Sequence, residues 1–268
     1  MKVYSYTIQG KRDSNEDQHV SYINLNGEET NKNNINFFAV FDGHGGKTVS
    51  KYLKENLPVY FMKKFDKNIF VKPDKFSKYV NKVYDLLQDN LKKNHPRAAN
   101  YCGSTACVSL MTKEEKKTYL WMVNVGDSRG VLCNKDGLAV QLSKDHKPNT
   151  PEERTRIEQL GGKDYIKYDG VDWRVKDLSL SRAFGDLECC PYVSHLPQIY
   201  RYKLSNEDSF LIKACDGLWD VLSNQDVVDY VLDLKKKNFK GNFAKALCDH
   251  AYNKGSLDNI TVIVYFFN

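Results

Sequence analysis

Apolar residues fall into short runs along the chain, and these runs predict β-strands. They are rich in Val, Phe, Tyr and Ile and are bounded by Gly, Asp or Asn, as strands usually are. The runs are Val3–Ile8, Phe37–Phe41, Ala106–Leu110, Tyr119–Val125, Gly130–Cys133, Phe210–Cys215 and Ile260–Phe267. The last run is apolar at both alternating sets of positions, so we expect a strand covered on both faces.

Apolar residues spaced three and four apart predict helices between these strands. Asp74–Asn94 carries one apolar stripe of this kind. A second helix begins at Thr150, which Pro151 and two Glu follow, and ends at Gly161. A third begins at Ser223. Because helices and strands do not alternate regularly, we expect two sheets packed face to face with helices outside.

Composition and charge narrow the functional classes. Of the 268 residues, 28% are charged and 41% are hydrophobic, as in soluble globular proteins. The longest apolar run, Val262–Phe267, is far shorter than the ~20 residues of a membrane helix, so we expect no membrane association. The net charge is +6, but only 8 of the 40 basic residues are Arg. Nucleic-acid sites favour clustered Arg with aromatic residues, so we expect no nucleic-acid partner.

The cysteines indicate the compartment. The seven cysteines are scattered apart from the neighbours Cys189 and Cys190, and no Cys-X-X-Cys pair occurs among them. This pattern argues against a disulfide framework or a zinc ribbon and favours a reducing compartment. The N-terminal residues show no signal-peptide pattern. We expect a cytoplasmic monomer, with the nucleus as a second location.

Acidic residues stand at the ends of four predicted strands, next to Gly or Asn. They are Asp13, Glu16 and Asp17 after the first strand, Asp42 after the second, Asp216 and Asp220 after Phe210–Cys215, and Asp258 before the last strand. Turn chemistry accounts for any one of them, because Asp-Gly is a common turn dipeptide. Brought together, however, they would repel one another strongly unless cations lay between them. Oxygen donors without Cys or paired His favour Mg²⁺ or Mn²⁺, so the residues alone predict a polycarboxylate metal site.

Eight short motifs follow one another over most of the chain. They are Arg12–Asp17, Phe41–Gly46, Gly103–Ala106, Asn124–Arg129, Leu142–Pro148, Ser181–Asp186, Cys215–Leu222 and Asp258–Thr261. In this order they resemble the metal-dependent serine/threonine phosphatases of the protein phosphatase 2C type, the PPM family.

The resemblance implies an α+β fold, a four-layer α-β-β-α sandwich with two central, mostly antiparallel sheets flanked by helix pairs. It implies a single catalytic domain over residues 1–268, with a flap subdomain at roughly 163–205 beside the catalytic cleft. It also implies two ions, Mg²⁺ or Mn²⁺, held by Asp42, which bridges them, the Gly43 carbonyl, Glu16 or Asp17, Asp216 and Asp258. Asp127 and Asp220 match the acids that hold a third, weaker ion.

The resemblance further implies hydrolysis of phosphoserine and phosphothreonine on proteins. The resemblance implies that the ions would supply a hydroxide for attack on phosphorus and that no phosphoenzyme would form. Arg12 binds the phosphoryl oxygens, and His44 is the candidate acid that protonates the leaving alkoxide. Arg182 helps to bind substrate. His146 and Lys147 are expected to be structural.

Two other functions stay open at this point. A metal-dependent phosphodiesterase uses a similar site but should carry a basic track for nucleic acid, whereas the eight Arg are dispersed. A pseudophosphatase would keep the fold and bind phosphoproteins without turnover. Every matched metal and phosphate position is intact, which favours the enzyme.

Overall fold

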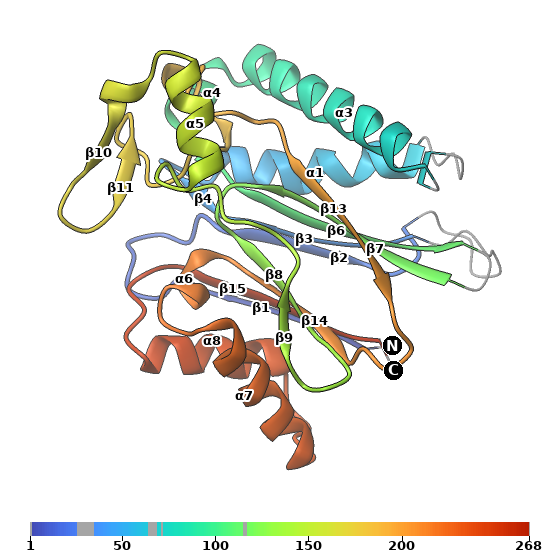
Figure 1. Ribbon diagram of the computed structural model, residues 1–268. Coiled ribbons are helices and arrows are strands. Elements are labelled where there is room, and N and C mark those ends of the chain that lie inside the picture. Colours follow the sequence, from blue (N-terminus) through green and yellow to red (C-terminus); the bar gives the residue numbers. More distant parts are fainter. Residues whose placement is uncertain (1, 26–34, 64–68, 71, 115–116, 268) are drawn as a thin grey trace.

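Two five-stranded antiparallel sheets form the centre of the protein. The computed structural model describes residues 2–25, 35–63, 69–70, 72–114 and 117–267 (Figure 1). In strand order, the first sheet consists of β1 (Lys2–Ile8), β15 (Ile260–Phe266), β14 (Phe210–Ala214), β8 (Arg129–Cys133) and β9 (Ala139–Gln141). The second sheet consists of β13 (Gln198–Leu204), β7 (Lys117–Val125), β6 (Ala106–Glu114), β3 (Asn36–Phe41) and β2 (Gln18–Tyr22).

Helices cover the outer face of each sheet (Figure 1). The second sheet is covered by α1 (Thr48–Lys63) and α3 (Pro73–Asn94), and the short α4 (Pro96–Tyr101) follows α3. The first sheet is covered by α7 (Asn224–Lys236) and α8 (Phe243–Asn253). The predicted α-β-β-α sandwich is therefore confirmed. All the strand pairs of both sheets are antiparallel.

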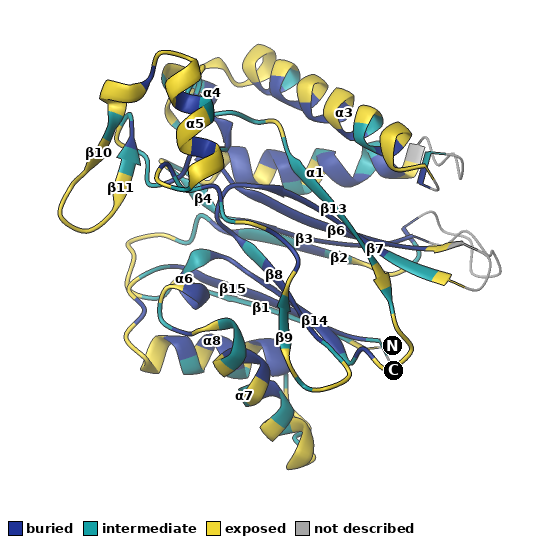
Figure 2. Ribbon diagram, in the orientation of Figure 1, coloured by how far each residue is buried: buried dark blue, intermediate teal, exposed yellow. Residues whose placement is uncertain are grey.

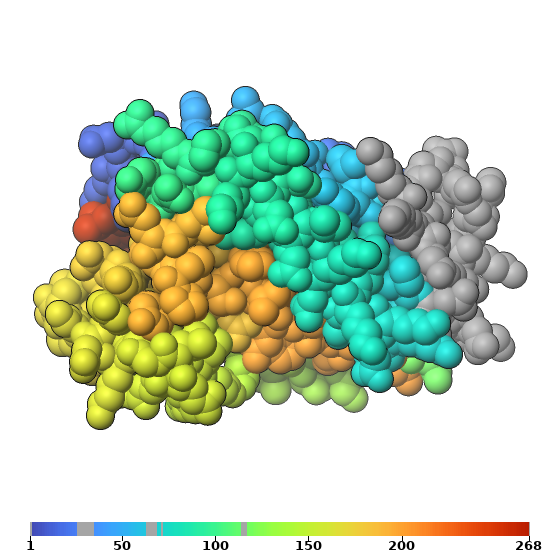
Figure 3. Space-filling view, turned by 90° about the horizontal axis from the view of Figure 1, so that it is seen from above, coloured from blue at the N-terminus to red at the C-terminus, as the bar shows by residue number. Residues whose placement is uncertain are grey.

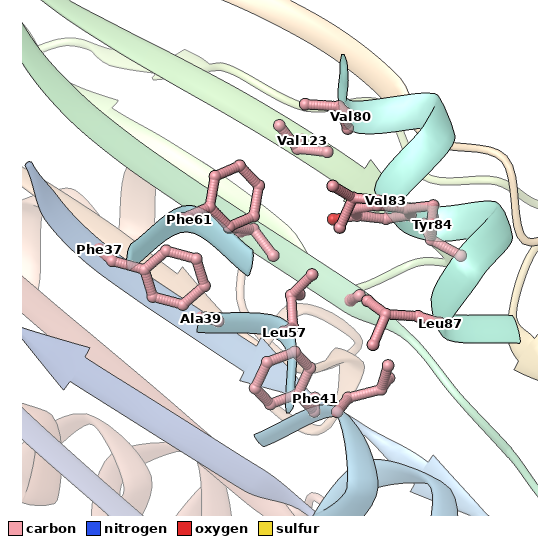
Figure 4. Packing of buried hydrophobic residues seen from close by; sticks show 14 of the residues in the cluster. Phe37, Ala39, Phe41, Leu57, Phe61, Val80, Val83, Tyr84, Leu87 and Val123 are labelled. Carbon is pink, nitrogen blue, oxygen red and sulfur yellow. The ribbon is translucent and has the colours of Figure 1, made fainter. Parts of the chain in front are cut away.

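Three hydrophobic cores separate the four layers. Between the second sheet and its helices, Phe37 and Phe41 of β3 pack with Phe61 of α1 and Leu87 of α3 (Figure 4). The core between the sheets contains side chains from both, among them Phe38 and Tyr265, Leu211, Met122 and Ile263. The third core lies under α7 and α8. Burial of apolar surface in these layers is what holds the sheets together.

The predicted elements agree with the observed ones where the pattern is strong. Each of the seven apolar runs coincides with a strand, and β15 is buried at all seven positions, as expected for a strand covered on both faces. The helices bury one side and expose the other (Figure 2). Ser223 and Asp226 form a reciprocal capping box at the start of α7. The strands β2 and β13 and the helix α8 had not been predicted.

Smaller elements lie at the end of the sandwich where the candidate site is found. A small sheet joins β12 (Phe184–Gly185), β5 (Gly103–Ser104) and β4 (Gly43–His44), and α6 (Asp216–Trp219) follows β14. A separate hairpin pairs β10 (Ile166–Tyr168) with β11 (Trp173–Val175). It lies beside α5 (Pro151–Gln159), with the turns η1 (Lys163–Tyr165) and η2 (Leu187–Cys189) in the same region.

The range 163–205, expected to form a flap subdomain, contains this hairpin. Ile157, Val175 and Val193 belong to a small core of its own. Gln198–Leu204, at the end of the expected range 163–205, forms β13 and pairs with β7 of the second sheet. Gln198–Leu204 of the expected range therefore belongs to the second sheet. Seen from above, the yellow flap lies at one end of the molecule beside the orange segment that leads into β13 (Figure 3).

Candidate active site

Strand register brings the acidic residues together. In the second sheet, β2 begins where β3 ends, because Gln18 pairs with Phe41, and β7 ends at the same edge. Asp17 and Asp42 directly flank these strand ends, and Asp127 lies two residues after the end of β7. In the first sheet, β15 begins beside the end of β14. Asp216 and Asp258 flank those ends, so two layers of strand ends face one shared site.

Four of the acids form a tight cluster around Asp42. Ligand atoms of Asp42, Asp127 and Asp216 lie within 4.8 Å of one another, and so do those of Asp17, Asp42 and Cys215. Asp42 belongs to both groups and so occupies the centre of the cluster. The cluster opens on a cavity of about 410 Å³, which Asp42, Asp127, Asp216 and Asp258 line together with Arg12, His44 and Glu16.

Burial and mutual repulsion disfavour ionisation of these acids. Burial, followed by the charge of Asp216, raises the pKa of Asp42 well above its usual value. Burial and the charge of Asp127 do the same to the pKa of Asp216. Burial raises the pKa of Asp17 to about 6, although Thr261 donates a hydrogen bond of 2.6 Å to its Oδ2. Nearby protein cations offset these charges only in part, because Lys147 lowers the pKa of Asp216 less than burial and Asp127 raise it.

The donor set fits divalent cations. The buried Oδ1 atoms of Asp17 and Asp127 have no hydrogen-bond partner in the part of the chain that the structure describes. Buried carboxylate oxygens are costly to leave unpaired, whereas Mg²⁺ and Mn²⁺ take such oxygens as ligands. Mutually repelling acids and unpaired carboxylate oxygens together are what a metal site offers, so the residues fit the ions implied by the resemblance.

Cys215 adds a group that sequence analysis did not include in the set. Its thiol is buried, and burial together with the charge of Asp17 raises its pKa well above the usual value. The sulfur accepts a hydrogen bond from the Thr261 amide (3.1 Å) and lies 3.3 Å from the Asn259 carbonyl, to which it donates. A protonated thiol held by the backbone is a poor metal ligand, so the usable donors are oxygens.

Glu16 and Asp17, the two alternative ligands, lie in different places at the site. Asp17 points into the acidic cluster, whereas Glu16 lines the cavity and accepts a hydrogen bond of 2.9 Å from the Gly46 amide. Gly43 must be glycine here, because a Cβ on it would lie 2.5 Å from the Glu16 carbonyl oxygen. Both acids lie at the site, and Asp17 is the one that lies against Asp42.

Arg12 and Asp258 form the rim of the cavity. The Nη2 of Arg12 donates to Oδ2 of Asp258 at 2.7 Å, and 61% of the arginine side chain is exposed. Asn259 holds the Arg12 loop in place, since its side chain donates to the carbonyls of Gln9 (2.7 Å) and Ser14 (2.8 Å). Asp220 is exposed and does not line the cavity, but it lies close enough to raise the pKa of Lys147.

His44 is paired with an acid that lies 142 positions later in the chain. Its Nε2 is 2.7 Å from Oδ2 of Asp186, whose side chain is 5% exposed. Burial alone would lower the pKa of His44, but the hydrogen bond and charge of Asp186 outweigh it and raise that pKa. The pair lies on Gly103, where a Cβ would come within 2.0 Å of the aspartate and 2.3 Å of the imidazole. Gly103 is therefore required by this pair.

Arg182 does not line the cavity. Its Nε and Nη2 donate to Oε1 of Glu153 at 3.0 and 2.6 Å, and its Nη1 donates to the Leu196 carbonyl. Glu153 also accepts from Arg156 and from the Ser181 hydroxyl. The structure thus places Arg182 in a largely buried ion-pair network with Glu153, away from the cavity that the acids line.

Glu153 should therefore stabilise the flap. Burial alone would raise its pKa, but Arg182 and Arg156 outweigh burial and lower it to about 2 from 4.5. A lowered pKa means that this stabilisation is present above pH 4.5 and is lost as the pH falls toward 2. We expect Glu153→Gln to lose about 3 kcal/mol of unfolding free energy at pH 7. Denaturant unfolding at pH 7 and at about pH 3.5 should show the difference shrinking at the lower pH.

A matched control comes from the same helix. Glu158 pairs with Arg154 on the surface, with 37% of the glutamate side chain exposed. Exposed pairs contribute little, so Glu158→Gln should change stability by less than about 0.5 kcal/mol. A Glu153→Gln protein as stable as the native chain at pH 7 would contradict the role assigned to this network.

The comparisons with known proteins identify the family. A family model described as Protein phosphatase 2C matches residues 1–260. The chain belongs to the protein phosphatase 2C family. It is thus an enzyme of the protein phosphatase class, as the sequence motifs had predicted, and protein substrates follow from that membership.

Relatives of this phosphatase occur in plants and in a virus. The chain is 38% identical over 266 residues to Probable protein phosphatase 2C 11 of Arabidopsis thaliana. The aligned region covers 98% of this chain and 66% of that protein. It is 40% identical over 176 residues to a PP2C-like domain-containing protein of Acanthamoeba polyphaga mimivirus. The aligned region covers 58% of this chain and 98% of the viral protein.

The fold also matches solved structures of the family. The crystal structure of serine-threonine phosphatase 2C from Toxoplasma gondii superposes with a TM-score of 0.83 at 23% sequence identity, covering 99% of this chain and 94% of that one. The likeness supports the four-layer sandwich. Among the described residues of this phosphatase, no helix is both long and apolar enough to span a bilayer.

Three residues of this phosphatase had no functional assignment from sequence. Asp186 closes the Ser181–Asp186 motif and binds His44, Lys147 pairs with Asp127, and Arg174 of the flap lines the cavity. Asp186 and Lys147 stand inside recognised motifs, which was a usable signal. Arg174 had none, because only the flap's path places it beside the acids.

Proposed function

We propose that this protein phosphatase hydrolyses phosphoserine and phosphothreonine on proteins, that it requires Mg²⁺ or Mn²⁺, and that water attacks phosphorus directly without a phosphoenzyme. The observation that carries the proposal is the cluster of Asp42, Asp127 and Asp216. Its carboxylates are buried at Asp127 and half-buried at Asp42 and Asp216, they repel one another, and they open on a cavity that Arg12 and His44 also line. Such a cluster is stable in its ionised form only with cations present.

In this proposal, the acids divide between two metal sites and a weaker third one. Asp42 would contact both ions of the pair, and the remaining ligands would be the Gly43 carbonyl, Asp17 or Glu16, Asp216 and Asp258. Asp127 and Asp220 would hold the third ion. When bound, divalent ions supply the acidity that makes a water nucleophilic near neutral pH.

Arg12 and His44 would act on the substrate itself. The planar guanidinium of Arg12 suits two phosphoryl oxygens, and among the described residues only Asp258 accepts from it. The alkoxide of phosphoserine is a poor leaving group and needs a proton as the bond to phosphorus breaks. With Nε2 of His44 directed at Asp186, its Nδ1 would donate that proton.

The first test is phosphate release from a phosphothreonine peptide during titration with Mn²⁺ and with Mg²⁺, against a chelated sample. We expect release only with metal. In parallel, Mn²⁺ at about 100 times its Kd should raise Tm by at least about 5 °C, because binding relieves the buried carboxylate charges.

The alternatives predict other results. A pseudophosphatase would gain stability with Mn²⁺ and bind the phosphopeptide but release no phosphate. A phosphodiesterase would cleave bis(4-nitrophenyl) phosphate faster than 4-nitrophenyl phosphate. Phosphate release that is unaffected by chelation, with no metal effect on Tm, would contradict the metal site.

A further inference from the structure

Lys147 places an ammonium group against the acidic cluster. The residue lies between β9 and α5, and its Nζ forms an ion pair with Oδ2 of Asp127. Only 26% of the lysine side chain and 2% of the aspartate side chain are exposed. The charges of Asp216 and Asp220 also act on this ammonium. It is therefore a charged group that faces the acids proposed for the third ion.

The backbone around Lys147 is tied to the turn that carries Asp127. The His146 amide donates to the Gly126 carbonyl, and the Gly126 amide donates to Nδ1 of His146, both at 3.1 Å. The side chain of Asn124 donates to the Lys144 carbonyl at 3.0 Å. Thr150 donates twice to the Lys147 carbonyl, at 3.1 Å from its amide and 2.9 Å from its hydroxyl. The lysine and the aspartate are thus held in a defined relation.

The two oxygens of Asp127 are in different situations. Oδ2 is paired with the ammonium, whereas the buried Oδ1 has no hydrogen-bond partner among the described residues. A cation that binds Asp127 through Oδ1 is repelled by the ammonium a few atoms away, and one that binds through Oδ2 has to displace it. In either case the lysine lowers the net attraction for a cation there.

We propose that Lys147 competes with a divalent cation for Asp127 and so sets the affinity of the weaker, third metal site. Among the described residues, the ion pair of Lys147 is with Asp127 and not with Asp42, so the competition is strongest at the third site. The inference rests on the proposed metal-dependent function. Because of this competition, the third site would fill only gradually as the divalent-ion concentration rises. The Lys147 side chain would set the concentration at which it fills.

The test measures Mn²⁺ binding and does not depend on turnover. Free Mn²⁺ is followed by electron paramagnetic resonance during titration of the native chain, Lys147→Met and Lys144→Met. Lys144 lies in the same loop, but its ammonium pairs with Glu152 and 54% of its side chain is exposed. We expect Lys147→Met to tighten the weakest site about tenfold or more. The control should bind like the native chain.

Two further variants complete the design. Lys147→Arg retains the charge and should keep the weakest site weak. Lys147→Gln can still donate to Asp127 without a charge, so it replaces the methionine variant if that protein fails to fold.

The inference would be overturned if the folded neutral variants bound Mn²⁺ at their weakest site with the same affinity as the native chain. Two tight sites with no third site in any variant would also overturn it but leave the proposed function standing. A native chain that binds no Mn²⁺ would overturn both.

Discussion

Asp42→Asn is expected to lower phosphate release on the order of 10³-fold or more while the fold persists. Asp42 is the acid shared by both groups of the cluster, so its replacement removes a charge from each proposed ion of the pair. Asparagine is isosteric, and the native carboxylate is already destabilised by burial and by Asp216. The metal-free variant should therefore melt at or above the native Tm.

Two measurements separate loss of the site from loss of structure. Phosphopeptide turnover at saturating Mn²⁺ gives the activity, and thermal unfolding with and without Mn²⁺ gives the fold and the metal response. Asp136→Asn, a change at an exposed turn between β8 and β9, serves as the control and should be neutral. Native turnover in Asp42→Asn would exclude Asp42 from the metal site.

His44→Ala is expected to slow hydrolysis of a phosphoserine peptide by about 10²- to 10⁴-fold, and hydrolysis of 4-nitrophenyl phosphate much less. The aryl leaving group departs as a stable anion and needs no proton, whereas the serine alkoxide does. Equal losses on the two substrates would mean that His44 positions a group and does not donate the proton.

Asp186→Asn should repeat this substrate dependence with a smaller effect, about 10- to 100-fold on the phosphopeptide. The amide can still pair with Nε2 of His44 but no longer stabilises the imidazolium. Glu188→Gln, an exposed change two residues away, is the control. If Asp186→Asn slowed both substrates alike, Asp186 would act on the fold of the site and not through His44.

The strongest patterns in the sequence were also the most informative. A continuous apolar run such as Ile260–Phe266 would expose apolar side chains to water unless both faces of its strand were covered. In the structure it forms a strand buried on both faces. The strand β13, which had not been predicted, lies at the edge of its sheet. It is half-buried and carries Arg201 and Lys203 among its apolar residues. An edge strand needs less apolar surface, so its pattern is weaker.

The sequence by itself determined the family, the two-sheet sandwich and the strand-end acids, because these depend on local residue order and on burial along each strand. Only the tertiary structure decided which side chains meet. Strand register directed Asp17 into the cluster and paired His44 with Asp186. Packing of loops and of α5 brought Lys147 to Asp127 and tied Arg182 to Glu153, away from the cavity. These pairings join residues from separate elements, and the charge and burial that define each role arise only once the sheets pack.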